Sequence, residues 1–217
     1  MNEILKAFEI IGTIAFSVSG GLMAIGAGLD LFGVMFVSCI TAFGGGIVRD
    51  LLLGLNPPAV FHNFPIFMIA FLTSFIVFIV AYIKRSHFSS FKTKVEYINN
   101  FFDAIGLAAF TVIGSEVGYI NGFSENGFII IVIGMLTGIG GGIFRDILID
   151  TAPFVFKKHV YAVAAICGSF LYYILRKYVG NVSLASVFAM VSVILLRLLA
   201  THFRWRLPKI DIHSENT

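Results

Sequence analysis

The sequence predicts an all-α membrane protein with seven transmembrane helices, arranged as two inverted three-helix repeats plus a seventh helix. Three observations predict this fold class. The composition is 58% hydrophobic and only 12% charged, with a mean hydropathy of +0.95, which excludes an ordinary soluble domain. Apolar runs recur at about the length needed to cross a hydrocarbon core of roughly 30 Å. A short motif built on three consecutive glycines occurs twice.

The apolar runs and the polar stretches between them divide the chain into four parts. The first three-helix repeat occupies residues 1–83, and a basic cytoplasmic linker follows at 84–101. The second repeat occupies residues 102–178, and the seventh helix with a short cytoplasmic tail occupies 179–217. The predicted spans are residues 5–27, 33–55, 64–83, 102–120, 127–149, 159–178 and 183–203.

The distribution of lysine and arginine predicts the orientation. Basic residues outside the spans are concentrated at the ends that follow the first, third, fifth and seventh spans, and cytoplasmic loops carry such an excess. We therefore expect a multi-pass protein of the cell membrane (inner or plasma membrane), with its N-terminus outside and its C-terminus cytoplasmic. The net charge of +3 then reflects topology, and no nucleic-acid partner is expected. The basic residues on the expected cytoplasmic side are Lys84, Arg85, Lys92, Lys94, Lys157, Lys158, Arg204, Arg206 and Lys209, against Lys6, Arg176 and Lys177 on the other side.

Two halves of the chain resemble each other. Residues Gly44–Asp50 and Gly140–Asp146 are nearly identical, lie 96 residues apart, and are each followed by a proline seven residues after the aspartate. Ala15–Gly20 also resembles Ala109–Gly114, at an offset of 94 residues. Because each copy contains an odd number of spans, the second copy is expected to run in the opposite direction. In transport proteins, inverted repeats place the functional site near the middle of the membrane, at broken helices.

The glycine triplets are expected to interrupt the second and fifth spans. Each glycine costs roughly 1 kcal/mol relative to alanine in a helix interior. Carbonyl groups freed by a break are tolerated only in contact with protein or with a water-filled cavity, so the breaks predict a polar passage. The alternative is that the glycines only allow helices to pack closely, which is the interpretation we give to Gly12, Gly106 and Gly134. The triplets are Gly44, Gly45 and Gly46, and Gly140, Gly141 and Gly142.

Five hydroxyl side chains are candidate ligands for a cation in this passage. Thr41 and Thr137 come just before the triplets, and Ser17, Ser19 and Thr111 lie on the matching faces of the first and fourth spans. Hydroxyls and carbonyls suit a cation that loses its hydration shell. The alternative, which we consider equally favoured, is a hydrogen bond from each hydroxyl to the carbonyl four residues back in its own helix.

Charged residues inside the spans usually mark function. Arg49 and Asp50 are neighbours in sequence and are not expected to face each other on a helix. From their depths in the membrane, we expect an ion pair between Arg49 and a glutamate of the first or fourth span. The candidate partners are Glu9 and Glu116.

For the second copy of the motif, the same depth argument pairs Arg145 with Asp103, which occupies the position of Glu9 in the repeat. Arg197 on the last span is expected either to reach the membrane surface or to meet Asp146. Two roles remain open for these charges: they hold the repeats together, or they line and gate the passage. No metal site and no catalytic motif is expected, so the protein is not expected to be an enzyme.

The paired Gly-Gly-Gly-x-x-Arg-Asp motifs in a seven-span chain of this length resemble the trimeric intracellular cation (TRIC) channels. Residues Glu9–Thr13 and the turn Gly28–Gly33 are similar to the bacterial branch, and the resemblance covers roughly residues 5–203. It implies a homotrimer in a lipid bilayer with a pore in each protomer, around kinked second and fifth helices. It also implies permeation of monovalent cations, K+ in preference to Na+, without a cofactor; a bound lipid is a further candidate.

The same domain type also carries the label of a glycine transporter. A carrier of a small amino acid is therefore the competing interpretation, because secondary transporters also use inverted repeats with helix breaks in mid-membrane. A membrane scaffold without transport is a third class. The sequence does not distinguish these classes, and it predicts neither the ion selectivity nor the gating stimulus.

Overall fold

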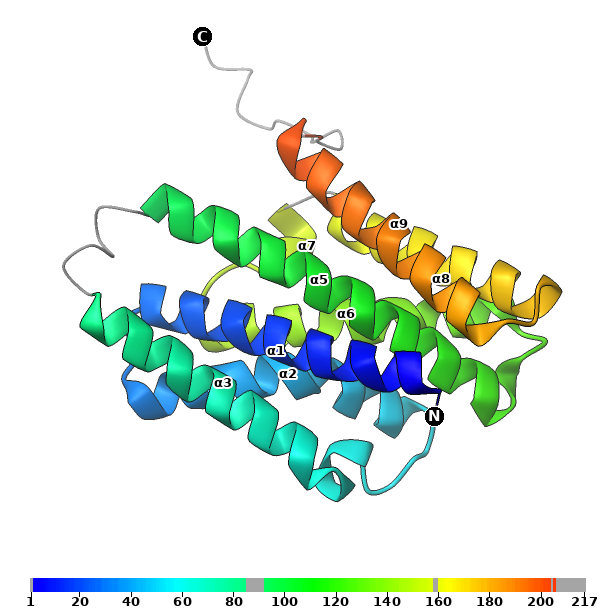
Figure 1. The fold of residues 1–217 in the computed structure, drawn as a ribbon, viewed down its shortest axis with the longest axis horizontal. Helices are drawn as coiled ribbons and strands as arrows, with labels where there is room; N and C mark the ends of the chain where they lie inside the picture. Colours follow the sequence, from blue (N-terminus) through cyan, green and yellow to red (C-terminus); the bar gives the residue numbers. More distant parts are fainter. Residues whose placement is uncertain (1, 85–91, 158–159, 204, 206–217) are drawn as a thin grey trace, which may run out of the picture.

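The computed structural model describes residues 2–84, 92–157, 160–203 and 205, and every regular element in these residues is a helix (Figure 1). The elements are α1 (Glu3–Gly26), α2 (Leu31–Leu52), η1 (Ala59–His62), α3 (Phe64–Ile83), α5 (Lys92–Gly118), η3 (Tyr119–Phe123), α6 (Gly127–Leu148), α7 (Phe154–Lys157), α8 (Tyr161–Tyr178) and α9 (Val182–His202).

Six helices in the described residues are long and apolar enough to cross a membrane: α1, α2, α3, α5 together with η3, α6 and α9. The predicted span 159–178 forms the 18-residue helix α8, which is not among the six. Its last turn carries Arg176 and Lys177, and these two charges lower the hydropathy of this short helix. The all-helical, membrane-spanning class is confirmed, and the count of seven spans stays a prediction.

Local sequence explains where most helices begin. An asparagine or aspartate side chain accepts a hydrogen bond from a backbone N–H of the first turn, which satisfies one of the donors that a helix start leaves free. This capping hydrogen bond occurs in helices of both halves of the chain. The capping residues are Asn2 for α1, Asp30 for α2, Asn63 for α3, Asn126 for α6 and Asn181 for α9.

Helices α2 and α6 end in the same way. Gly54 has a φ of 70°, and the backbone N–H of Leu55 donates to the carbonyl of Asp50 at 2.8 Å. In the second half Asp150 has a φ of 53°, and Thr151 N–H donates to the carbonyl of Asp146 at 2.9 Å. Glycine adopts this left-handed conformation without steric cost, and aspartate is one of the few other residues that tolerate it.

Four helices form the centre of the molecule. Helix α1 packs on α5 and α2 packs on α6, while α1–α2 and α5–α6 also pack together. Helix α3 covers one flank through α1 and α2, and α8 and α9 cover the other through α6 and α5. Figure 1 shows this order, with α1 and α5 side by side in the middle of the view. Ring stacking of Phe16 on Phe110 at 5.4 Å joins the two halves.

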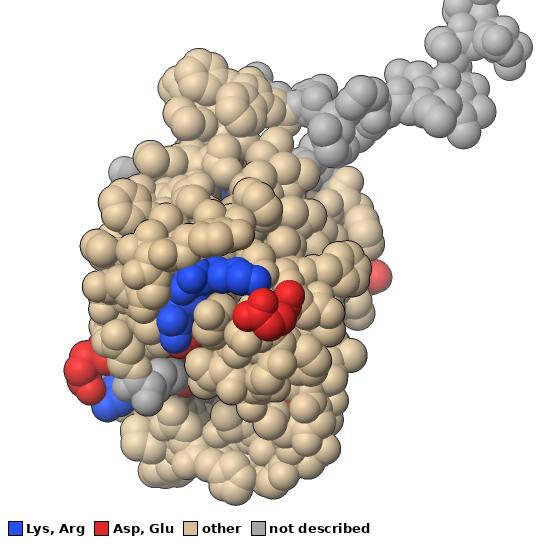
Figure 2. All heavy atoms as spheres, turned by 90° about the vertical axis from the view of Figure 1, so that its right-hand side faces the viewer, with Lys and Arg blue, Asp and Glu red and all other residues tan. Residues whose placement is uncertain are grey.

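The outer faces of the peripheral helices are apolar. On α3 these include Leu72 and Ile76, and on α9 they include Phe188 and Leu195, all more than half exposed. Seen along the helices in Figure 2, the end of the bundle is largely uncharged, with a few basic and acidic side chains gathered in small groups. Apolar flanks around a polar interior are expected of a helical bundle in lipid.

The prediction that the glycine triplets interrupt their helices is wrong. Helix α2 runs without a break from Leu31 to Leu52, and α6 runs without a break from Gly127 to Leu148. A break inside the hydrocarbon region would leave backbone groups without partners, which costs several kcal/mol for each group. Continuous helices that use their glycines for close contact avoid that cost, and this was the alternative interpretation.

The triplets are where α2 and α6 cross, backbone against backbone. A Cβ atom on Gly45 would overlap the carbonyl oxygen of Thr137, and a Cβ atom on Gly141 would overlap the carbonyl oxygen of Thr41. A Cβ atom on Gly140 would lie 2.8 Å from the Cα atom of Gly45. The contact is reciprocal: Gly45 of α2 meets Thr137 of α6, and the equivalent Gly141 of α6 meets the equivalent Thr41 of α2. Reciprocal contacts of this kind are those of surfaces related by a two-fold axis.

Glycines outside the triplets also allow close packing. A Cβ atom on Gly12 would lie 2.9 Å from the Cβ atom of Ala109, and one on Gly106 would overlap the ring of Phe16. One on Gly134 would overlap the hydroxyls of Ser115 and Ser169. The packing interpretation of these three glycines is confirmed.

Helix α5 begins at Lys92, ten residues before the predicted span at 102–120. No glycine or proline separates residues 92–101 from the apolar run, so the helix extends through them. The expected linker at 84–101 is therefore partly helical, and its residues 85–91 lie outside the described residues.

The helix crossing predicts opposite effects for two neighbouring glycines. We expect Gly45→Ala to lower the free energy of unfolding by about 1–3 kcal/mol, because the added methyl group is forced against the α6 backbone. We expect Gly46→Ala to be neutral or to stabilise by up to about 1 kcal/mol, because alanine is the better helix former. At Gly46 the nearest atom to an added Cβ is 3.7 Å away.

The measurement is thermal unfolding of the purified variants in detergent, with Gly46→Ala as the matched control from the same triplet. Equal midpoints for the two alanine variants would contradict the backbone contact.

Candidate functional site

The most deeply buried polar cluster surrounds Arg145 of α6, whose side chain is fully buried. One nitrogen, Nη1, donates to Asp103 Oδ1 of α5 at 2.8 Å and to Ser19 Oγ of α1 at 2.7 Å. The Nε nitrogen donates to Asp146 Oδ1 at 2.8 Å. The predicted ion pair between Arg145 and Asp103 is confirmed, and it connects α1, α5 and α6.

Arg197 of α9 joins the same cluster. Its Nη2 atom lies 3.6 Å from Asp103 Oδ2, and its guanidinium lies 4.6 Å from the centre of the Tyr161 ring. The expected contact with Asp146 is not among those that the structure describes, because Asp103 is the nearer carboxylate. Tyr161 also donates its hydroxyl to Asp103 at 3.3 Å. Two arginines and two aspartates make the cluster neutral, which offsets the cost of burying charge.

Asn99 is a polar residue of this cluster that the sequence interpretation missed. Its side-chain oxygen accepts a hydrogen bond from Ser19 at 2.8 Å, and the residue is 1% exposed. It was assigned to the linker because residues 84–101 are polar on average. Asn99 and Asp103 are four residues apart and therefore share one face of a helix, which is the signal that could have found it.

The second cluster surrounds Arg49 of α2, and here the predicted partners are wrong. The guanidinium contacts its sequence neighbour Asp50, with Nη2 at 2.7 Å and Nε at 2.8 Å from Oδ1. The rule that adjacent residues do not face each other describes the direction of the Cβ atoms. The arginine side chain is long enough to fold back over the next residue, and a buried carboxylate needs a donor nearby. Arg145 and Asp146 pair in the same way.

Both aspartates of the motifs also fix the chain that follows. Asp50 Oδ2 accepts from the backbone N–H of Ala59, the first residue of η1, at 2.8 Å. Asp146 Oδ2 accepts from the backbone N–H of Phe154, the first residue of α7, at 2.7 Å. Each aspartate thus receives the arginine on one oxygen and a short helix on the other. A proline lies immediately before each short helix, Pro58 before η1 and Pro153 before α7.

The two glutamates proposed as partners of Arg49 do not form ion pairs with it. Glu116 accepts hydrogen bonds from Tyr172 at 2.5 Å and from Arg176 at 3.2 Å, both on α8. Glu9 forms no hydrogen bond or ion pair with any residue that the structure describes, although it is close enough to Arg49 to interact electrostatically. Glu116 pairs with Arg176 because it lies beside the basic last turn of α8. Its depth in the membrane alone did not predict this partner.

The five candidate hydroxyl ligands divide into three groups. One of them, Ser19, belongs to the Arg145 cluster, where it accepts from Arg145 and donates to Asn99. Thr41 and Thr137 donate to the carbonyls of Val37 and Ile133 in their own helices, both at 2.6 Å, as the alternative interpretation expected. Ser17 and Thr111 are fully buried, and neither hydroxyl has a hydrogen-bond partner in the described residues. Buried polar groups are normally paired, so these two are candidates for contact with water or an ion.

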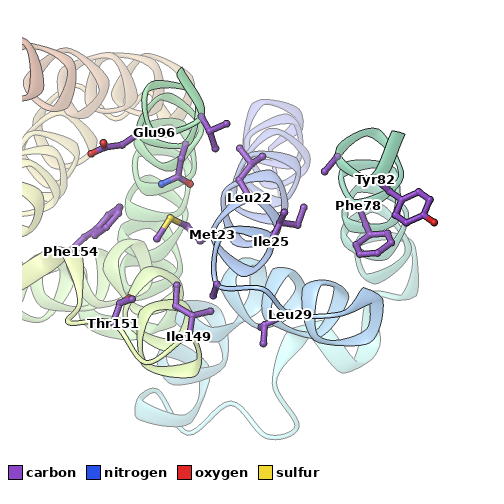
Figure 3. A pocket seen from close by; sticks show the side chains of 15 residues that line it. Leu22, Met23, Ile25, Leu29, Phe78, Tyr82, Glu96, Ile149, Thr151 and Phe154 are labelled. Carbon is purple, nitrogen blue, oxygen red and sulfur yellow. The ribbon is translucent and has the colours of Figure 1, made fainter. Parts of the chain in front are cut away.

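Cavities reach the bundle from both ends. The larger has a volume of about 790 Å³ and is surrounded by the end of α1, the end of α3, the start of α5 and the chain between α6 and α7 (Figure 3). Asn99 and Phe154 line this cavity. Asn99 contacts the Arg145 cluster through its hydrogen bond with Ser19, and the ring of Phe154 lies 4.8 Å from the guanidinium of Arg145. The smaller has a volume of about 40 Å³ and adjoins Arg49. The two cavities share no lining residue.

The Arg145 cluster predicts a charge-balance effect. Asp103→Asn should destabilise the protein by about 3–5 kcal/mol, because it leaves two buried arginines with one carboxylate. Adding Arg197→Met restores neutrality, so the double variant should be more stable than Asp103→Asn alone. The check is a double-mutant cycle measured by thermal unfolding in detergent. Additive effects of the two substitutions would contradict a shared network.

Comparison with known proteins places this arrangement in a family. A family model described as "Glycine transporter" matches residues 6–82 and 100–177. The chain is 34% identical to the UPF0126 membrane protein YvgT of Bacillus subtilis over 97% of this chain and 98% of that one. It is 32% identical to the UPF0126 inner membrane protein YadS of Escherichia coli K12, with 92% and 93% of the two chains covered.

Solved structures give the same result. A prokaryotic TRIC channel crystallised in 0.5 M KCl superposes with a TM-score of 0.84 at 33% identity, covering 95% of this chain and all of that one. A second structure, from work on the structural basis for conductance through TRIC cation channels, superposes with a TM-score of 0.82 at 32% identity. The match covers 96% of this chain and 98% of that one. The TRIC orthologue from Rhodobacter sphaeroides gives a TM-score of 0.84 at 25% identity, covering 94% and all of that chain. The chain belongs to the family of the UPF0126 membrane proteins, it matches the glycine-transporter family model, and it shares the fold of the prokaryotic TRIC channels.

Proposed function

We propose that the protein is a channel for monovalent cations, with K+ preferred over Na+ and one pore inside each protomer. The observation that carries the proposal is the similarity to prokaryotic TRIC channels over essentially the full length of both chains. The coarser statement, that this is a membrane protein of a cation-channel fold, follows from the same similarity.

The proposal includes the topology. Seven spans cross the membrane as two inverted three-helix repeats and a final helix, with the N-terminus outside, the C-terminus in the cytoplasm and three copies in the assembly. The reciprocal contacts of Gly45 with Thr137 and of Gly141 with Thr41 support an internal two-fold relation between the repeats. The stacking of Phe16 on its equivalent Phe110 supports the same relation.

The ion pathway that we propose runs between the two cavities, past the α2–α6 crossing. From the cytoplasmic side it starts in the large cavity, passes Asn99 and Ser19, and meets the buried hydroxyls of Ser17 and Thr111. At the crossing the α2 and α6 backbones are in contact, so conduction requires these helices to move apart. Glycines permit such a change because their contact surface has no side chains to interlock.

The motif charges have a supporting role in this proposal. The buried guanidinium groups of Arg49 and Arg145 would repel a cation, but each is held against at least one carboxylate. Asp50 and Asp146 each connect an arginine to the following short helix. The clusters thus hold the two ends of the pathway in shape while their fields largely cancel.

The competing function is a carrier of glycine, which only the description of the family model favours. A channel needs a continuous wet path, whereas a carrier needs an occluded site and alternating access. Purified protein reconstituted into a planar bilayer distinguishes them. We expect unitary currents in potassium solutions. When sodium replaces potassium on one side, the reversal potential should move toward the equilibrium potential of potassium, because K+ permeates better than Na+. Saturable glycine uptake into vesicles without unitary currents would contradict the channel.

The unpartnered hydroxyls predict which residues face the pathway. We expect Thr111→Val to leave the thermal unfolding midpoint unchanged or raised, because the hydroxyl that it removes has no partner to lose. It should lower the unitary potassium conductance, because it removes a ligand from the pathway. The matched control is Ser115→Ala on the same helix, whose hydroxyl is bonded to the carbonyl of Thr111 at 3.0 Å.

We expect this control to leave the conductance unchanged. Normal conductance in Thr111→Val would exclude its hydroxyl from the pathway.

A further inference from the structure

The two motif clusters differ in the position that the repeat assigns to Glu9 and Asp103. In the second half, Asp103 pairs with Arg145 at 2.8 Å and faces Arg197 at 3.6 Å. In the first half, Glu9 forms no hydrogen bond or ion pair with a described residue. The arginine that could reach it, Arg49, is held by Asp50 through two nitrogens of its guanidinium. The repeats therefore match in sequence here but not in contacts.

The nearest basic residue on the same helix does not neutralise Glu9 either. Lys6 lies three residues before it, but its ammonium donates to Glu3 at 2.8 Å. Among the residues that line the small cavity, the charged ones are Glu9, Arg49 and Asp50. Their formal charges add up to −1, whereas the Arg145 cluster with its two arginines and two aspartates is neutral. The last helix supplies the missing positive charge in the second half through Arg197, and nothing equivalent reaches the first half in the described residues.

Glu9 also faces a space that can hold an ion. The cavity of about 40 Å³ is lined by Glu9 and Thr13 of α1, which are four residues apart and so share one face of the helix. Its volume is close to the roughly 30 Å³ that one water molecule occupies in the liquid. Thr13 is fully buried, and its hydroxyl has no hydrogen-bond partner in the part of the chain that the structure describes. Buried polar groups are normally paired, so this hydroxyl is available to a ligand in the cavity.

We infer that this cavity is a binding site for one monovalent cation, with the Glu9 carboxylate and the Thr13 hydroxyl as ligands. The inference rests on the proposed function, because it makes the site the first stop of a cation that enters from the N-terminal end of α1. Oxygen donors and one net negative charge suit K+ or Na+. A calcium ion takes six to eight oxygen ligands, commonly from several carboxylates, and this site offers one free carboxylate.

The ion pair of Arg49 and Asp50 sets the charge of this site. The positive charge of Arg49 offsets the negative charge of Asp50, so the cavity carries the single negative charge of Glu9. A single charge attracts a cation without holding it too tightly to leave, which is what conduction requires of a binding site. The neutral Arg145 cluster at the other end offers no such attraction, so the two ends of the pathway should differ in their affinity for cations.

Two readouts test the inference, and one of them does not require conduction. The first is the thermal unfolding midpoint in detergent, measured in potassium chloride and in N-methylglucamine chloride at equal ionic strength. A ligand that binds the folded state raises the midpoint. We expect potassium to stabilise the wild-type protein and Glu9→Asp, and to stabilise Glu9→Gln much less. The matched control Glu125→Gln, an exposed glutamate whose partner Lys177 lies on α8 and away from this cavity, should respond like the wild type.

The second readout is the unitary conductance as a function of potassium concentration. We expect Glu9→Gln to lower the conductance about three-fold or more at low potassium, where a fixed negative charge concentrates cations, and to approach the wild type at high potassium. If Glu9→Gln does not fold, Thr13→Val provides the same test. It should raise the midpoint in N-methylglucamine and reduce the gain from potassium, because it removes a ligand that has no protein partner.

Each outcome decides between the claims. A wild type that conducts, with Glu9→Gln and Thr13→Val unchanged in both readouts, overturns the cation site and leaves the channel intact. A wild type that does not conduct, but whose potassium stabilisation is lost in these variants, supports the site and overturns the proposed function. The absence of both conduction and potassium stabilisation in the wild type overturns both.

Discussion

The contact between the backbones of α2 and α6 organises the rest of the molecule. Gly45 lies against the carbonyl of Thr137 and Gly141 against the carbonyl of Thr41, so the two helices meet backbone to backbone with no room for a side chain at either glycine. The motif arginines follow each triplet by about one helical turn, so this contact sets where they lie. It also determines how α1 and α5, which pack on these helices, meet each other through Phe16 and Phe110. In lipid, where apolar side chains gain little by leaving the solvent, such close packing is a main source of helix association.

Buried charge is the second constraint. Arg145, Asp103, Asp146 and Arg197 come from three helices and are almost completely inaccessible. Breaking any one ion pair among them leaves a charge that the bilayer interior cannot solvate. The cluster therefore specifies how α5, α6 and α9 fit together, although it contributes less to net stability than its number of contacts suggests. The Arg49 cluster has fewer groups: Arg49 pairs with Asp50, and Glu9 faces a cavity.

Composition and periodicity were sufficient to predict the class of fold, because a run of about 20 apolar residues has few other uses. The depth argument also found the Arg145–Asp103 pair, since both residues lie on regular helices whose positions scale with residue number. It failed for Arg49 and Glu116, because the choice between acceptors depends on which helix lies alongside, and the sequence does not contain that information. The continuity of the glycine-bearing helices could not be predicted either. Propensity disfavours it, and a tertiary contact overrides propensity.

The aspartate of each motif contacts two parts of the chain that lie in different surroundings. One carboxylate oxygen holds an arginine inside the bundle, and the other holds the first backbone N–H of a short helix in the loop beyond α2 or α6. An asparagine in the same place could accept with only one of its two terminal atoms, so a single such exchange would release either the guanidinium or the loop. The aspartate therefore joins the arginine inside the bundle to a loop outside the α2–α6 crossing.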